Sequence, residues 1–130
     1  MSTTISGTSG VTFPDSTSMQ TGQQACKAWV NFDGTGTVAI RESYNVSSIT
    51  DNGSGDYTAN FTTAMSDANY SITHWATQQT AGSNGYGYGI LSSGTSTIPN
   101  ITTSSFRFKT GYFGGLQVED LPYVGISFFR

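Results

Sequence analysis

The feature that most constrains the fold is a series of short runs in which apolar and polar residues alternate. In one of them, Ala28, Val30 and Phe32 occupy every second position. Successive side chains of a β-strand point to opposite faces, so a period of two predicts a strand with one buried face. The run closes with the sequence DGTG at residues 33–36, which is typical of a tight turn.

Such runs recur along the chain at a spacing of roughly ten residues, each bounded by Gly, Asn, Ser or Pro. We therefore predict an all-β fold, an antiparallel β-sandwich of about 7–8 strands with a jelly-roll-like arrangement. Single helical turns are expected only at residues 18–24 and 63–68. The predicted strands are residues 25–32, 37–44, 46–50, 57–62, 70–77, 86–91, 104–110 and 123–130.

The composition supports this fold class and describes the surface. The chain has 130 residues, enough for one domain, and includes 18 Ser, 20 Thr and 16 Gly. Helix-forming residues are scarce, which excludes an all-helical fold. Only 10% of the residues are charged, although charge normally covers a monomer's surface. We therefore expect a surface of hydroxyl groups, amide groups and a subunit interface.

Charge and cysteine content exclude several classes of partner. The net charge is −3 and there are only five basic residues, so nucleic acid and anionic membranes are poor partners. No apolar run approaches the roughly 18 residues that a membrane span needs, and we expect neither membrane insertion nor a secretory signal. Cys26 is the only cysteine, which excludes an internal disulfide and a Cys-based zinc site. No cofactor is expected.

Residues 1–24 differ from the remainder of the chain. Their only sizeable apolar residues are Ile5, Val11, Phe13 and Met19, too few for a core of their own. We predict that this segment is an extended N-terminal connector whose apolar residues pack against copies of themselves, with a flexible leader as the alternative. Residues 25–130 then form the β-sandwich tip domain.

Three groups of residues could in principle form a catalytic or metal site, and for each the sequence favours a structural role instead. His74 lies in a predicted strand with no nucleophile beside it, and Cys26 begins an apolar strand where an inert thiol is expected. The acidic residues lie mostly in Gly-rich turns, where Asp bonds the local backbone, rather than in a pair suited to glycoside cleavage. The sequence DNGSGD at residues 51–56 lacks the distal Glu of a calcium loop. We expect no catalytic residue and no metal site.

The most suggestive segment for binding is GSNGYGYG at residues 82–89. Alternating Tyr and Gly lets rings stand on one face, and Tyr offers a flat apolar surface with a polar rim for a sugar or a peptide. The alternative is that these rings pack in the core or against a neighbouring subunit. The predicted ligand-binding residues are Trp75, Asn84, Tyr86, Tyr88 and Tyr112.

Several segments carry a resemblance to a known family: AWVNFDGTGT (residues 28–37), YNVSSITDNGSGDYT (residues 44–58) and MSDANY (residues 65–70). Together with GTSGVTFPDST at residues 7–17, they strongly resemble the C-terminal domain of bacteriophage tail-fibre and related virion structural proteins. The resemblance covers residues 7 to about 75. One departure is Ser66, where the family pattern usually has Pro.

The resemblance implies a homotrimeric, β-rich appendage tip that contacts the bacterial surface. It places the protein in the virion, after assembly in the host cytoplasm, with other virion proteins bound through the N-terminal segment. A charge-poor sandwich fits this picture, because copies of the chain supply burial that one subunit lacks. Three weak sites on a trimer would attach to a surface glycan or protein through avidity.

Two alternatives remain open. The first is a capsid-decorating or head-fibre structural protein of a phage virion, favoured by the lack of a recognisable long shaft. The second is a polysaccharide depolymerase, although such enzymes usually need a much longer parallel β-helix than this chain allows.

Overall fold

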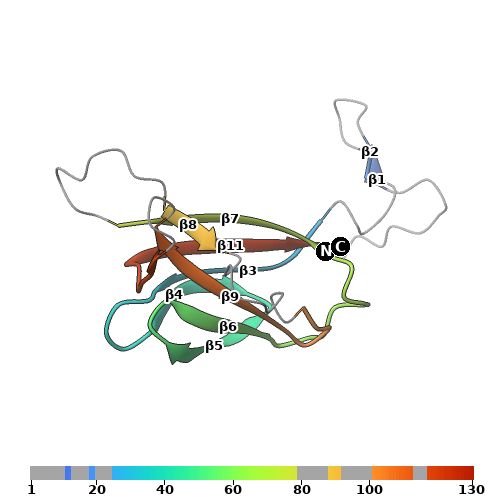
Figure 1. The fold of residues 1–130 in the computed structure, drawn as a ribbon. Coiled ribbons are helices and arrows are strands. Elements are labelled where there is room, and N and C mark those ends of the chain that lie inside the picture. Colours follow the sequence, from blue (N-terminus) through green and yellow to red (C-terminus); the bar gives the residue numbers. More distant parts are fainter. Residues whose placement is uncertain (1–10, 13–17, 20–24, 79–87, 92–100, 113–116) are drawn as a thin grey trace.

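The computed structural model describes residues 11–12, 18–19, 25–78, 88–91, 101–112 and 117–130 (Figure 1). The described residues form strands, turns and bends and contain no helix. Two antiparallel sheets enclose one apolar core, which confirms the predicted all-β sandwich. Strands β1 (Val11–Thr12) and β2 (Ser18–Met19) form a separate antiparallel pair.

Each sheet is built mainly from strands that pair with antiparallel neighbours. The first sheet contains, in spatial order, β4 (Ala39–Tyr44), β3 (Cys26–Asp33), β11 (Tyr123–Phe129) and β7 (Ser71–Thr77). The second sheet contains β10 (Gln117–Val118), β9 (Ser105–Tyr112), β6 (Asp56–Phe61) and β5 (Val46–Gly53), and β8 (Tyr88–Leu91) also pairs with β9. Figure 1 shows β7 and β11 on one side of the molecule and β5 and β6 on the other.

Much of the core consists of strand side chains at alternate positions, one face of each strand being turned inward. Ala28, Val30 and Phe32 of β3 are each at most 1% exposed. Residues of the second sheet meet them across the sandwich, and Tyr57 and Ala59 of β6 are fully buried. The same alternation places further strand residues in the core, namely Phe61, Phe106, Phe108, Val124, Ile126 and Phe128.

Two groups of aromatic rings fill the two ends of this core. The Phe32 triad consists of Phe32, Tyr57 and Phe108, with ring centroids 5.2–6.1 Å apart. The Phe128 triad consists of Phe61, Tyr70 and Phe128, with ring centroids 4.9–5.8 Å apart. The second triad is wholly edge-to-face, a favourable geometry for aromatic pairs.

The chain changes from one sheet to the other at Asn45, between β4 and β5. This residue has a positive φ of 54°, a left-handed conformation in which Asn is enriched among non-glycine residues. Its amide donates to the carbonyl groups of Lys27 and Thr63, both at 3.0 Å, and accepts from the Thr63 N–H at 2.7 Å. The corner is therefore fixed by hydrogen bonds to both neighbouring segments.

The strands predicted at residues 46–50 and 57–62 pair as an antiparallel hairpin, β5 and β6, and the turn between them is shorter than the gap left by the prediction. The ladder continues through Asp51↔Tyr57 and Gly53↔Asp56, so β5 extends to Gly53 rather than ending at residue 50. Gly53 and Gly55 have positive φ values of 129° and 59°, which glycine adopts without strain. A Cβ atom at Gly55 would also lie only 2.7 Å from backbone atoms of Glu119 and Thr110.

The predicted helical turn at residues 63–68 is wrong. The N–H of Thr63 bonds to the Asn45 side chain and the N–H of Met65 to the Thr103 carbonyl at 2.8 Å, so these donors serve long-range contacts. At residues 18–24, Ser18 and Met19 form a strand, and residues 20–24 lie outside the described residues.

The strand order also differs from the jelly-roll-like arrangement. In a jelly roll most consecutive strands lie in opposite sheets, whereas β3–β4 and β5–β6 are each neighbours within one sheet. A short turn favours pairing of the two strands that it joins. The strands β3 and β4, and likewise β5 and β6, are therefore neighbours in one sheet.

Candidate functional site

The structure gathers three of the predicted binding residues at one end of the sandwich. Trp75 lies near the end of β7, and β8, which lies beside β7, begins with Tyr88. The backbone of Tyr88 pairs with that of Tyr112 at the end of β9. Tyr112 is half-buried. Asn84 and Tyr86 lie outside the described residues.

Trp75 is exposed on the outer face of the first sheet. Its exposed fraction is 54%, and its ring lies 6.2 Å from that of Tyr123, centroid to centroid. In the strand register Trp75 pairs with Gly125, which carries no side chain. A Cβ atom at Gly125 would lie 3.7 Å from Cε3 of the indole. The indole is therefore held against the sheet while about half of it faces outward.

A charged pair lies beside these rings. The Arg41 guanidinium carbon is 4.5 Å from the centroid of the Tyr123 ring, and its Nη2 is 3.0 Å from Asp33 Oδ2. Hydrogen bonds from the Thr35 hydroxyl and N–H lower the pKa of Asp33 and keep its carboxylate charged. Aromatic surface and hydrogen-bonding groups thus lie together.

Asn31 completes a row across three strands of this face. It pairs with Gly125, which in turn pairs with Trp75. Its Oδ1 is buried and, among the described residues, is the one buried side-chain N or O atom without a hydrogen-bond partner. Buried acceptors normally have a donor, so this atom stands out. We call this set the Trp75 face, defined as Asn31, Asp33, Arg41, Trp75, Tyr123 and Gly125.

In the core beneath this end, the Tyr57 hydroxyl forms hydrogen bonds with two loops, the one after β3 and the one before β11. Its oxygen lies 2.6 Å from Asp120 Oδ1 and 3.0 Å from the Gly34 carbonyl oxygen. Burial, followed by the hydrogen bond to Asp120, raises the pKa of Tyr57 well above its usual value, so the phenol stays protonated. The loop before β11 is thereby anchored to the core.

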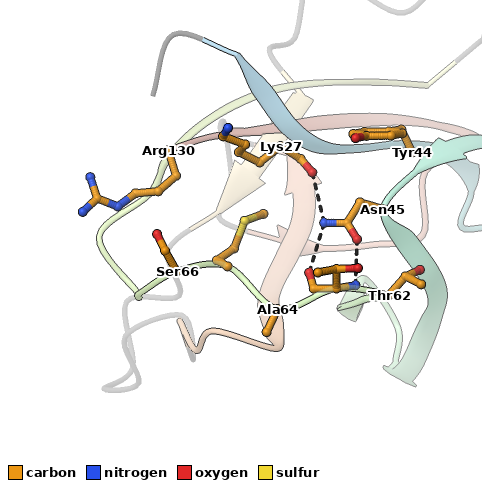
Figure 2. Close-up of a pocket in the computed structure, with 9 residues that line it drawn as sticks. Lys27, Tyr44, Asn45, Thr62, Ala64, Ser66 and Arg130 are labelled. Carbon is orange, nitrogen blue, oxygen red and sulfur yellow. Dashed lines mark hydrogen bonds between the residues drawn. The ribbon is translucent and has the colours of Figure 1, made fainter. Parts of the chain in front are cut away.

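A pocket of about 740 Å³ lies at the opposite end of the sandwich (Figure 2). Its walls come from the start of β3, the corner between β4 and β5, the segment after β6 and the residue after β11. We call it the Lys27 pocket, defined as Lys27, Tyr44, Asn45, Thr62, Thr63, Ala64, Met65, Ser66 and Arg130.

The cations of this pocket differ in their partners. Arg130 forms a paired hydrogen bond with the Asp67 carboxylate, including Nε to Oδ1 at 2.8 Å, and its side chain points away from the other labelled residues in Figure 2. This pair lowers the pKa of Asp67. Lys27 has no acidic partner among the described residues, unlike the four other basic side chains of the chain, Arg41, Arg107, Lys109 and Arg130.

The sequence did not predict this pocket, because its residues are spread from position 27 to position 130. A repeated motif signals local features such as the Gly-Tyr segment, whereas the pocket depends on how corners and strand ends meet. The only signals were Asn45 after Tyr44, typical of a turn, and a lysine at the start of a strand.

The remaining sequence hypotheses concern chemistry. His74 lies on strand β7, as predicted, and is exposed there. The thiol of Cys26 lies 3.2 Å from the Ala28 carbonyl oxygen. In the described part of the chain, no three His, Cys, Asp or Glu side chains are grouped to hold a metal ion. Within the same residues, no helix is long and apolar enough to cross a membrane.

The chain was compared with family models, with curated proteins and with solved structures, and none of the three comparisons gave a match.

Proposed function

We propose that this protein is a tail-fibre-like component of a phage virion that attaches to the bacterial host surface by binding a glycan at the Trp75 face. The observation that carries the proposal is the half-exposed indole of Trp75, braced by Tyr123 beside the Arg41–Asp33 pair. The indole combines a broad apolar surface with an N–H group at its rim, a combination that makes Trp frequent at binding interfaces.

The chemistry of this face suits a saccharide. A sugar ring has an apolar face of C–H groups, which packs on an indole, and hydroxyl groups at its rim that need hydrogen-bond partners. The carboxylate of Asp33 and the guanidinium of Arg41 provide such partners beside the ring.

Rigidity favours binding at this face. Trp75 lies on a strand with a full antiparallel register to β11, and Arg41 is held by both Asp33 and the Tyr123 ring. Groups that are already positioned lose little conformational entropy when a ligand binds.

The proposal includes a homotrimer joined through residues 1–24. Its support is the low charged fraction of 10%, together with exposed apolar side chains such as Ile40 and Ile101, each 37% exposed. Three weak sites on one particle raise the effective affinity without stronger single contacts. Light scattering on the full chain and on a chain without residues 1–24 tests this part, and a monomer in both would contradict it.

The binding test uses a panel of purified bacterial capsular polysaccharides and O-antigens, with the labelled full chain as the probe. We expect Trp75→Ala to reduce binding at least tenfold. His74→Ala is the matched control, because His74 is exposed on the same strand but belongs to neither site. Equal binding by Trp75→Ala, or no binding to any glycan, would contradict the proposal. Saturable binding to capsids instead would favour the capsid-decorating alternative.

A further inference from the structure

The Lys27 pocket has the features of a second binding site, at the end of the sandwich opposite the Trp75 face. It is concave, and its volume of about 740 Å³ falls within the roughly 300–1,000 Å³ of pockets that hold small molecules. None of its residues belongs to the Trp75 face.

The charge of the pocket selects the ligand class. All five basic residues of the chain are described, and Lys27 is the one without an acidic group of the described residues within 4.0 Å. It is partly buried at the pocket wall, where an anion would be shielded from water on one side. A hydrogen bond between an ammonium and a carboxylate is stronger than one between neutral groups.

The other lining groups select a sugar rather than a bare anion. Tyr44 is 58% exposed and lines the same pocket, so its ring offers a surface for the C–H face of a sugar. Figure 2 shows Lys27 and Tyr44 along one side, with Ala64 and Ser66 across from them and Asn45 beside Tyr44. Three hydroxyl-bearing residues, Thr62, Thr63 and Ser66, also line the pocket.

The pocket wall is also fixed in place. The Asn45 side chain bonds to Lys27 on one side and to Thr63 on the other, and the Thr62 N–H donates to the Asn45 carbonyl at 3.1 Å. Lys27 and the segment 62–66 therefore keep a constant separation, which a preformed site requires.

We propose that the Lys27 pocket binds a carboxylate-bearing sugar residue, with the Lys27 ammonium on the carboxylate and the Tyr44 ring on the sugar. The site rests on its own residues and goes beyond the proposed function. The soluble trisaccharide probes below measure it directly, so a failure of glycan attachment at the Trp75 face leaves this test unaffected.

The probes are two acidic trisaccharides, trigalacturonate and sialyllactose. The neutral counterpart of trigalacturonate is its full methyl ester, and the neutral counterpart of sialyllactose is lactose. Calorimetric titration of the full chain should show at least tenfold tighter binding of an acidic probe than of its counterpart. Raising the salt concentration from 0.05 M to 0.5 M should weaken the acidic probe several-fold, because screening shortens the reach of the Lys27 charge.

The variants assign the site. Lys27→Met should weaken the acidic probe at least tenfold, Lys27→Arg should retain most of the affinity, and Tyr44→Ala should weaken it about fivefold. Lys109→Met is the matched control. It removes the same charge from a lysine that lies, with its partner Asp56, on the second sheet and outside the pocket. Thermal unfolding of each variant checks that the fold is intact. Equal affinity for acidic and neutral probes, an unchanged Lys27→Met variant, or no binding of either acidic probe would overturn the proposal.

Discussion

The two ends of the sandwich are alike inside and different outside. Each end is filled by an aromatic triad that includes a tyrosine, and each of these tyrosines contacts a loop through its hydroxyl group. Tyr57 reaches Gly34 and Asp120, whereas the Tyr70 hydroxyl donates toward the Thr102 carbonyl at 3.0 Å. The same device therefore anchors the loops at both ends.

The surfaces at the two ends diverge because different backbone features form them. The Trp75 face is a flat strand surface, and its side chains follow directly from the alternation along β7, β11 and β3. The Lys27 pocket is concave, because the chain turns between sheets at Asn45 and the segment after β6 bonds to that corner. Strand surfaces thus offer platforms and corners offer pockets, and one small fold provides both.

The largest expected effect concerns the corner. Asn45→Ala removes three side-chain hydrogen bonds and places alanine at a φ of 54°, so we expect a loss of about 2–4 kcal/mol in the free energy of unfolding. Urea denaturation measures it. Asn45→Gly keeps the φ free of strain and should recover about 1 kcal/mol of that loss. Equal stability of the wild type and Asn45→Ala would mean that the pocket wall is not held as described.

The tyrosine anchors give the next largest effect. Tyr57→Phe leaves the Asp120 carboxylate without its phenol partner, and we expect it to cost about 2 kcal/mol, against about 1 kcal/mol for Tyr70→Phe. The difference follows because a hydrogen bond to a charged group is stronger than one to a carbonyl. If Tyr70→Phe costs more than Tyr57→Phe, the end at the Trp75 face is the more weakly anchored one.

The same anchors predict a loss of stability in alkali. Burial raises the pKa of Tyr70 to about 12, and an unfolded tyrosine has a pKa of about 10. The folded protein then holds the proton more tightly, so stability is complete below pH 10 and falls as the pH rises toward 12. Urea midpoints measured from pH 9 to pH 11.5 should fall less steeply for Tyr70→Phe than for the wild type.

How much of this could be predicted from the sequence depends on the range of the interactions. The alternation of Ala28, Val30 and Phe32 predicts a strand and its buried face, because both depend only on neighbouring residues. The hairpin of β5 and β6 was equally local. The prediction of a helical turn at residues 63–68 was wrong because the N–H groups of Thr63 and Met65 bond to residues distant in sequence.

The candidate sites follow the same rule. Trp75 could be proposed as a binding residue from the sequence because a tryptophan in an alternating strand is visible locally, and in the structure it is 54% exposed. The surroundings of Trp75 could not be predicted without the strand order. They are its pairing with Gly125, its contact with Tyr123 and the unpartnered oxygen of Asn31. The Lys27 pocket required in addition the position of the chain's last residue, Arg130, beside Lys27 and the segment 62–66.

The smallest expected effect separates binding from stability at the Trp75 face. The indole of Trp75 lies over Gly125 on the surface rather than in the core, and its ring contact is with Tyr123, at 6.2 Å between centroids. The stability of the folded state therefore depends little on it. We expect Trp75→Ala to change the free energy of unfolding by about 0.5 kcal/mol, the range of ordinary surface substitutions. Urea denaturation beside the glycan-binding assay compares the two effects on one variant. A loss of several kcal/mol would make the indole a structural residue, because a side chain retained for binding alone contributes little to the fold that carries it.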